Sequence, residues 1–315
     1  MSRESLTVGR IGVYDTFDRP FPPDLLADVL DDRVDPPVTV VEDRDGLAAC
    51  DAVVALGHDD AFLDTVEWVH EIRAGYDDYP VDRYEEAGIV VTNSSGLASG
   101  IVAESVIGLM LTLARGFHRY RDHQASREWG RLPWGRPFLL GRSSLCVVGM
   151  GQIGSGVATR AGALGMDVTG VDVRPVSALG VDHVYDIDDR LDVLADARFV
   201  ALTTPLTPAT EGLVSTDELA AMREDAFLVN AGRGGVVDQD ALVAALETGE
   251  IAGAAVDVFA EEPLPAESPL WEMDEVIVTP HVAGQANHYH ELLADLLTTS
   301  LARVDRGKDP WNRVV

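Results

Sequence analysis

The chain has 315 residues, 46% of them hydrophobic, which is long enough for two domains with separate cores. Asp and Glu total 53 against 24 Lys and Arg, so the formal net charge is −29. A chain this negative excludes nucleic acid and anionic membrane as expected partners, because both carry the same sign of charge.

Strand-like apolar runs alternate with helical or turn segments through the first 98 residues. A first strand is expected at residues 7–14, followed by a helix at 24–30. Further strands are predicted at residues 39–41, 52–56, 68–72 and 89–91. Strands that alternate with helices favour a parallel sheet covered by helices on both faces.

The middle of the chain begins with an apolar helix predicted at residues 101–114, which is too short to span a bilayer. Residues 115–142 then mix Arg, His, Trp and Gly without a clear period. We interpret this segment as an extended arm that packs on a neighbour, and a homodimer contact is the natural hypothesis.

A Gly-x-Gly-x-x-Gly sequence at residues 149–154 follows a predicted strand and opens a predicted helix. Gly149 permits the tight turn, Gly151 lets the backbone approach a pyrophosphate, and Gly154 lets the helix pack closely on the strand. The intervening side chains carry no cation: Met150, Gln152 and Ile153. A diphosphate would therefore rest on backbone N–H groups and the helix dipole. The motif predicts a dinucleotide-binding domain.

Two charged residues after the next predicted strand, residues 167–171, bear on which dinucleotide binds. Asp172 has the spacing of the carboxylate that accepts from a ribose 2′-hydroxyl, which favours NAD. Arg174 is expected either to stack on adenine or to receive a 2′-phosphate. NAD or NADP is therefore expected, with NAD favoured and dual use kept as an alternative.

The remaining apolar runs complete a second α/β domain. Strands are predicted at residues 199–202, 226–229, 252–256 and 276–278, with helices at 238–246 and 287–304. Either Asp238 or Asp240 is expected to cap the first of these helices. No internal repeat interrupts the pattern.

Four motifs, in this order along the chain, resemble the D-2-hydroxyacid dehydrogenase family: residues 148–154, 230–234, 256–264 and 279–284. Weaker likeness at residues 73–77 and 93–104 extends the resemblance over nearly the whole chain. It implies an α/β fold of two doubly wound parallel-sheet domains. A Rossmann coenzyme domain at 99–285 would be inserted in a flavodoxin-like substrate domain made of residues 1–98 and 286–315.

The resemblance implies reversible hydride transfer between nicotinamide and a small 2-oxo acid or D-2-hydroxy acid. Arg233, in a glycine-flanked loop, would orient the substrate carboxylate. His281 would exchange the hydroxyl proton, with Glu262 hydrogen-bonded to its imidazole. Glu261 is adjacent, but the family spacing from Asp257 selects Glu262.

The same resemblance assigns binding contacts and no metal site. The nicotinamide side would lie near Ala231, Gly232, Arg233, Asp257, His281 and Gly284, and the adenosine side near Asp172, Thr204 and Pro205. The substrate would meet Arg73, Ala74, Gly75 and Tyr76, with the N–H groups of Ala74 and Gly75 on its carboxylate. Arg73 is either a second cation or a member of a rim salt bridge.

Narrower and different functions remain open beside this one. A phosphoglycerate dehydrogenase or a glyoxylate/hydroxypyruvate reductase would share all the motifs. A corepressor-like protein of the same fold, which senses dinucleotide and binds partners, would share them too. Turnover of 2-oxo acids separates the enzymes from the binding protein.

The acidic composition and the cysteines indicate where such a protein works. Self-repulsion at this charge destabilises the compact state in dilute buffer, but at 1 M salt the Debye length falls to roughly 3 Å. We therefore hypothesise a salt-adapted, halophile-type protein. Cys50 and Cys146 lie in apolar runs and are expected to be reduced core residues. The N-terminus carries no export signal, so a cytoplasmic location is expected.

Overall fold

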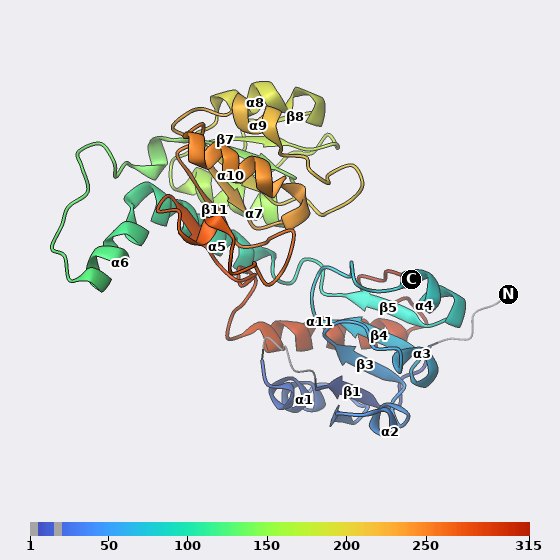
Figure 1. Cartoon of the computed structure of the whole chain (residues 1–315). Helices are drawn as coiled ribbons and strands as arrows, with labels where there is room; N and C mark the ends of the chain where they lie inside the picture. Colours follow the sequence, from blue (N-terminus) through green and yellow to red (C-terminus); the bar gives the residue numbers. More distant parts are fainter. Residues whose placement is uncertain (1–5, 16–20) are drawn as a thin grey trace. The chain divides into compact units, whose positions relative to one another are not determined.

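The computed structural model describes residues 6–15 and 21–315, which fall into two compact units. Unit 1 combines Met1–Ala98 with Gln285–Val315, and unit 2 is Ser99–Gly284. The second cut therefore falls one residue before the boundary predicted from the sequence. Figure 1 shows the chain coloured from its N-terminus to its C-terminus.

Unit 1 is built on a five-stranded parallel sheet in the order β2-β1-β3-β4-β5. Its strands are β1 (Ile11–Tyr14), β2 (Val38–Val41), β3 (Ala52–Ala55), β4 (Trp68–Glu71) and β5 (Val90–Asn93). The order 2-1-3-4-5 is that of flavodoxin-like sheets. Every residue of β3 and β4 is buried, as expected for strands covered on both faces.

Helices from both ends of the chain cover the sheet of unit 1. Their bounds are α1 (Pro23–Asp31), α2 (Arg44–Leu47), α3 (Phe62–Thr65), α4 (Val81–Ala87) and α11 (Tyr289–Val304). The long α11 packs against α1 and buries Leu293, Leu297 and Leu301 at helical spacing. The segment after the inserted unit thus completes the core of the first.

Unit 2 contains a seven-stranded parallel sheet in the order β12-β11-β10-β9-β6-β7-β8. Its strands are β6 (Ser144–Val148), β7 (Asp167–Val171), β8 (His183–Tyr185), β9 (Phe199–Leu202), β10 (Phe227–Asn230), β11 (Gly253–Val256) and β12 (Val276–Val278). Counted from β6, this is the Rossmann order 3-2-1-4-5-6 with one further strand. The two-sheet α/β prediction is confirmed.

Alternate residues of the strands in unit 2 contact helices on opposite faces. Cys146 and Val148 of β6 belong to the core cluster shared with α8 (Arg190–Asp196), α9 (Thr216–Ala221) and α10 (Gln239–Thr248). The helices α5 (Ser99–Arg115) and α7 (Gln152–Ala163) pack against each other. Asp238 caps α10 by accepting from the N–H of Ala241 at 3.1 Å, which selects it over Asp240.

The arm at residues 115–142 departs from the prediction, because it contains a helix, α6 (Phe117–Ser126). None of the residues of α6 is buried, so the helix has no apolar stripe for the sequence to reveal. In Figure 1 α6 and the segment after it extend away from the sheet of their own unit. The arm ends in the 3₁₀ turn η1 (Leu140–Arg142).

Both cysteines are free and buried, as predicted. Burial raises the pKa of the Cys146 thiol to about 12. Within the described ranges, no single helix is long and apolar enough to cross a membrane. The helices α5 and α6 pass that test only as a pair, bent by 67° at the break between them.

We expect Gly154→Ala to destabilise unit 2. A Cβ at residue 154 would lie 2.1 Å from the carbonyl oxygen of Gly149, and overpacking against backbone costs about 1–3 kcal/mol or more. Gly151→Ala is the matched control, since nothing lies within 4 Å of a Cβ at that position. Thermal unfolding of the ligand-free protein measures both variants. Equal melting temperatures would contradict the packing argument.

Candidate functional site

The glycine-rich turn joins the end of β6 to the start of α7. Gly149 has φ of +92°, and a Cβ there would meet the Thr204 side chain at 2.7 Å, so only glycine fits this turn. Gly151 is the N-cap of α7, and the space around it is open. An anion can therefore come close to the backbone at Gly151 and accept from the N–H groups in the first turn of this twelve-residue helix.

Asp172 follows β7 and is tied to this turn. Its Oδ2 accepts from the N–H of Met150 at 2.8 Å, and its Oδ1 accepts from the N–H of Arg174 at 2.9 Å. The Arg174 guanidinium grips both carboxylate oxygens, at 3.0 and 3.2 Å. Burial alone would raise the pKa of Asp172, but these bonds lower it below its usual value. Arg174 thus offsets the charge of Asp172.

The loop after β9 supplies the other wall of the turn. Thr204 lies against Gly149 and against Gly232, whose added Cβ would come within 2.8 Å of the Thr204 carbonyl oxygen. Thr204 Oγ1 is buried without a hydrogen-bond partner in the described part of the chain. A buried hydroxyl of this kind fits a polar ligand better than an apolar core. Pro205, next in the chain, is exposed.

Asn230 at the end of β10 fixes the loop that carries Arg233. The buried Asn230 amide accepts from the N–H of Gly232 at 3.1 Å and donates to the carbonyl of Arg233 at 3.2 Å. Ala231 between them is buried. The Arg233 side chain is half-buried, and its Nη1 donates to the Gly232 carbonyl at 2.9 Å. The guanidinium is therefore held in one place by backbone.

Gly234 opens the 3₁₀ turn η3 (Gly234–Val236) and lies directly against the backbone that leads to Glu262. A Cβ on Gly234 would fall 1.9 Å from the carbonyl carbon of Phe259 and 2.5 Å from the N atom of Ala260. Glu262 Oε1 in turn accepts from the Phe259 N–H at 2.9 Å. The Arg233 loop and the Glu262 loop are thus packed backbone to backbone.

His281 and Glu262 form the pair that the sequence motifs imply. His281 Nδ1 lies 2.8 Å from Glu262 Oε2, and the imidazole is about half exposed. Because a carboxylate accepts hydrogen bonds, Nδ1 carries the proton in this contact. Nε2 is then the ring nitrogen that can exchange a proton with a ligand. Three residues after β12, His281 adopts φ of +52°, a conformation that residues with side chains rarely take.

Asp257, predicted at the nicotinamide side, is hydrogen-bonded to the loop after β12. Its carboxylate is 1% exposed and accepts from Thr279 Oγ1 at 2.5 Å, Val282 N at 3.0 Å and Ala283 N at 2.9 Å. Its carbonyl accepts from the His281 N–H at 2.8 Å. Asp257 therefore holds the loop that presents His281. Gly284, which ends this loop, is partly buried.

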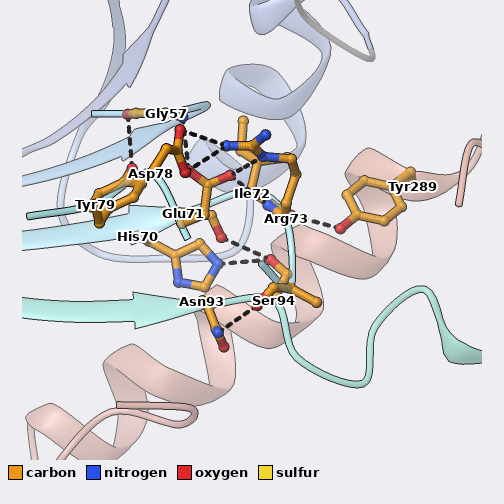
Figure 2. A network of polar contacts seen from close by, with 11 residues as sticks. Gly57, His70, Glu71, Ile72, Arg73, Asp78, Tyr79, Asn93, Ser94 and Tyr289 are labelled. Atoms are coloured by element: carbon orange, nitrogen blue, oxygen red, sulfur yellow. Dashed lines mark hydrogen bonds and ion pairs between the residues drawn. The ribbon is translucent and has the colours of Figure 1, made fainter. Parts of the chain in front are cut away.

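The loop predicted to meet the substrate lies in unit 1, directly after β4. Figure 2 shows the Arg73 guanidinium directed at Glu71 and Asp78. Its Nε donates to Glu71 Oε1 at 3.0 Å and its Nη2 to Asp78 at 3.1 Å, so the salt-bridge alternative is the one observed. Ala74 and Tyr76 are exposed, and Gly75 is partly buried.

Sequence reasoning missed three residues that position the site: Asn230, Gly234 and Thr279. Only Gly234 carried a signal, since a glycine beside a candidate site residue is a reason to suspect close backbone contact. The hydrogen bonds of Asn230 and Thr279 depend on the fold and leave no mark in the sequence. The structure brings His281 to Glu262 and the Arg233 loop to the Glu262 loop, and it brings Thr204 to Gly149.

Comparison with known proteins identifies the family of the chain. The D-isomer specific 2-hydroxyacid dehydrogenase NAD binding domain matches residues 107–283, more than half of the chain. A glyoxylate reductase of Korarchaeum cryptofilum is 33% identical over 301 residues, which are 91% of this chain and 89% of that protein. A D-3-phosphoglycerate dehydrogenase of Methanocaldococcus jannaschii is 36% identical over 74% of this chain and 44% of its own length.

Solved structures of similar fold include members of the same family. A D-isomer specific 2-hydroxyacid dehydrogenase from Xanthobacter autotrophicus Py2, in complex with NADPH and MES, is 28% identical, with a TM-score of 0.81 over 98% of both chains. The predicted family resemblance is confirmed over residues 107–283 and over 91% of the chain against the glyoxylate reductase. The chain belongs to the D-isomer specific 2-hydroxyacid dehydrogenase family and is an NAD(P)-dependent oxidoreductase.

Proposed function

We propose that this enzyme reduces a small 2-oxo acid to the D-2-hydroxy acid, and reverses the reaction, with His281 as acid and base. The observation that carries the proposal is the 2.8 Å contact between His281 and Glu262 beside the loop that holds Arg233. A proton donor, a carboxylate partner and a fixed cation are the three groups that this reaction needs from a protein.

A bound nicotinamide would supply the hydride to the carbonyl carbon, or accept it in the reverse direction. In the direction of reduction, His281 Nε2 gives its proton to the carbonyl oxygen. Glu262 fixes the orientation of the imidazole through its contact with Nδ1. Arg233 grips the substrate carboxylate in bidentate fashion, which aligns the carbonyl for transfer. The backbone N–H groups of Ala74 and Gly75 provide further donors for that carboxylate.

The residues around the glycine turn fit a dinucleotide. Gly151 leaves room for the diphosphate, and the first turn of α7 presents its N–H groups. We assign Thr204 Oγ1 and Pro205 to the adenosine side, and Ala231, Gly232 and Gly284 to the nicotinamide side. Because Arg174 offsets the charge of Asp172, we propose that both NADH and NADPH are accepted.

The function is tested by a panel of 2-oxo acids assayed with NADH and NADPH from dilute buffer to molar KCl. Glyoxylate, hydroxypyruvate, pyruvate and branched 2-oxo acids form the panel, with 3-phosphoglycerate for the reverse direction because of the phosphoglycerate dehydrogenase relative. Turnover that rises with KCl would support the salt-adaptation proposal, which rests on the charge of −29. No turnover with any acid would favour a dinucleotide-sensing binding protein.

We also propose a homodimer formed through the arm at residues 115–142. Trp129 and Trp134 are fully exposed there, and Phe117 is about half exposed. Large apolar side chains gathered on one exposed segment mark a protein contact. We therefore place the dimer contact at the segment that carries Trp129 and Trp134.

Substitution of the proposed catalytic residues should separate chemistry from cofactor binding. His281→Ala and Arg233→Ala are each expected to lower kcat/KM by about 10²–10⁴, since each removes a positioned proton donor or a bidentate cation. Fluorescence titration should show NADH binding within about threefold of the wild type. Loss of NADH binding in both variants would instead indicate that they damage the fold.

Glu262→Gln should move the pH profile of reduction to lower pH. Reduction requires the protonated imidazole, and the carboxylate is what favours that form, so its loss confines activity to more acidic solution. The profile of kcat/KM for the 2-oxo acid measures this shift. Glu261→Gln is the matched control, because Glu261 is exposed and adjacent. An unchanged profile in Glu262→Gln would remove Glu262 from the proton-exchanging pair.

The Asp172–Arg174 pair should decide the balance between the two cofactors. Arg174→Ala is expected to raise KM for NADPH about tenfold and to change KM for NADH less, because a charge-assisted contact to the 2′-phosphate is lost. Asp172→Asn keeps an acceptor for Met150 N–H and should shift preference toward NADPH. Parallel changes for both cofactors in both variants would contradict this assignment.

The arm proposal is tested by sedimentation in molar KCl. The wild type is expected to be a dimer, and Trp129→Ser with Trp134→Ser should shift it toward monomer at micromolar concentration. Leu179→Ser is the control, because Leu179 is exposed elsewhere in unit 2. A monomeric wild type, or a double variant that stays dimeric, would refute the arm as the interface.

A further inference from the structure

The last residues of the chain lie along the edge strand β5 of unit 1. The Val314 N–H donates to the Val91 carbonyl at 2.7 Å, and the Val91 N–H donates to the Val315 carbonyl at 3.3 Å. Arg313 pairs with Thr92 in an antiparallel bridge. The segment Trp311–Val315, which we call the tail, thus adds short antiparallel pairing to an otherwise parallel sheet.

Asn312 is the residue through which the tail reaches the loop after β5. Its Nδ2 donates to the carbonyls of Asn93, at 3.1 Å, and Ser95, at 2.9 Å, while its own carbonyl accepts from the Asn93 N–H at 3.2 Å. Asn312 has φ of +54°, which asparagine tolerates better than most residues. The residue type therefore suits both the backbone and the contacts.

Asn93 links the tail to the loop that is proposed to bind the substrate. The Asn93 side chain is 3% exposed, and its Nδ2 donates to the Ala74 carbonyl at 2.7 Å. Its Oδ1 accepts from the Ser95 N–H at 3.1 Å. Because β4 and β5 are neighbours, with Glu71 opposite Asn93, the end of β5 lies beside the start of the loop. Figure 2 shows Asn93 at this strand end.

Glu71 holds the same loop from its other flank. This fully buried carboxylate accepts from the N–H of Arg73 at 2.8 Å, and from the N–H of Gly57 at 2.7 Å. The loop is therefore fixed at Arg73 by Glu71 and at the Ala74 carbonyl by Asn93. Anchors on both sides of a peptide fix the direction of its N–H groups, which is what a carboxylate receptor requires.

We infer that Asn312 and Asn93 are positioning residues for substrate binding, so that the tail is part of the substrate site although it touches no substrate. The inference rests on the proposed function, in which the N–H groups of Ala74 and Gly75 contact the substrate carboxylate. Loss of the relay from Asn312 through Asn93 to Ala74 would let these N–H groups turn away. The substrate's KM would rise, while the chemistry at His281 would persist.

Asn312→Gly is the sharpest test. Glycine keeps the left-handed backbone and removes only the amide that donates to Asn93 and Ser95. We expect KM for the 2-oxo acid to rise about three- to tenfold, with kcat and KM for NADH within about twofold, as expected for one or two lost hydrogen bonds. Asn93→Asp, which keeps the acceptor for Ser95 and loses the donor to Ala74, should act in the same direction.

Arg313→Ala is the matched control, because Arg313 neighbours Asn312 in the tail but its side chain bonds only to Asp309 and Val315 among the interactions described. It should leave KM unchanged. Hydrogen exchange of a peptide covering residues 72–79 gives a readout independent of turnover, and it should accelerate in Asn312→Gly and not in Arg313→Ala.

The outcomes separate this inference from the proposed function. If the wild type reduces 2-oxo acids but Asn312→Gly leaves both KM and loop exchange unchanged, the positioning role is refuted and the function stands. Equal KM changes in Asn312→Gly and Arg313→Ala would refute it as well, since they would reflect general loosening of the tail. If no acid is turned over, the function fails, and loop exchange alone then decides whether the relay holds the loop.

Discussion

The buried carboxylate of Asp257 is the group on which the geometry of unit 2 depends most. An ionised carboxylate is expensive to bury unless its oxygens are hydrogen-bonded, and Asp257 receives donors from Thr279, Val282 and Ala283. All three lie in the loop after β12. These bonds hold the loop on both sides of His281, so Asp257 also fixes the His281 backbone. The φ of +52° at His281 is an unfavourable conformation that these bonds offset.

Close backbone contacts extend this constraint to the other side chains of the site. Gly232 lies against Thr204, and Gly234 lies against Phe259 and Ala260. The loops after β9, β10 and β11 are thus spaced by backbone atoms, which have no rotamers to relax. The position of Arg233 relative to Glu262 therefore depends on Gly234, where one added carbon would push the Arg233 loop away from the Glu262 loop.

The sequence predicted the elements whose pattern is local. Apolar runs marked eleven of the twelve strands in the described residues, most of them at nearly their observed bounds, and the spacing of Gly149, Gly151 and Gly154 indicated the turn before α7. It missed α6, because an unburied helix has no apolar period, and β8, a three-residue edge strand. Spacing alone left Arg73 open between a second cation and a salt bridge, and its contacts with Glu71 and Asp78 depend on the geometry of the loop. It gave no sign that Asp257 holds the His281 loop, because those hydrogen bonds join residues that are distant in sequence.

The two units place their polar residues by one rule, at the carboxyl ends of parallel strands. In unit 2 the strand order reverses between β6 and β9, and the glycine turn and Thr204 follow these two strands. In unit 1 the order reverses between β1 and β3, yet the loop at Arg73 follows β4. The Arg73 loop therefore lies one strand away from the reversal point. Glu71 bridges that distance, because its carboxylate accepts from Gly57, after β3, as well as from Arg73. A buried acid thus links the loop after β4 to the reversal point of its sheet, and Asn93 and Asn312 hold that loop from the opposite side.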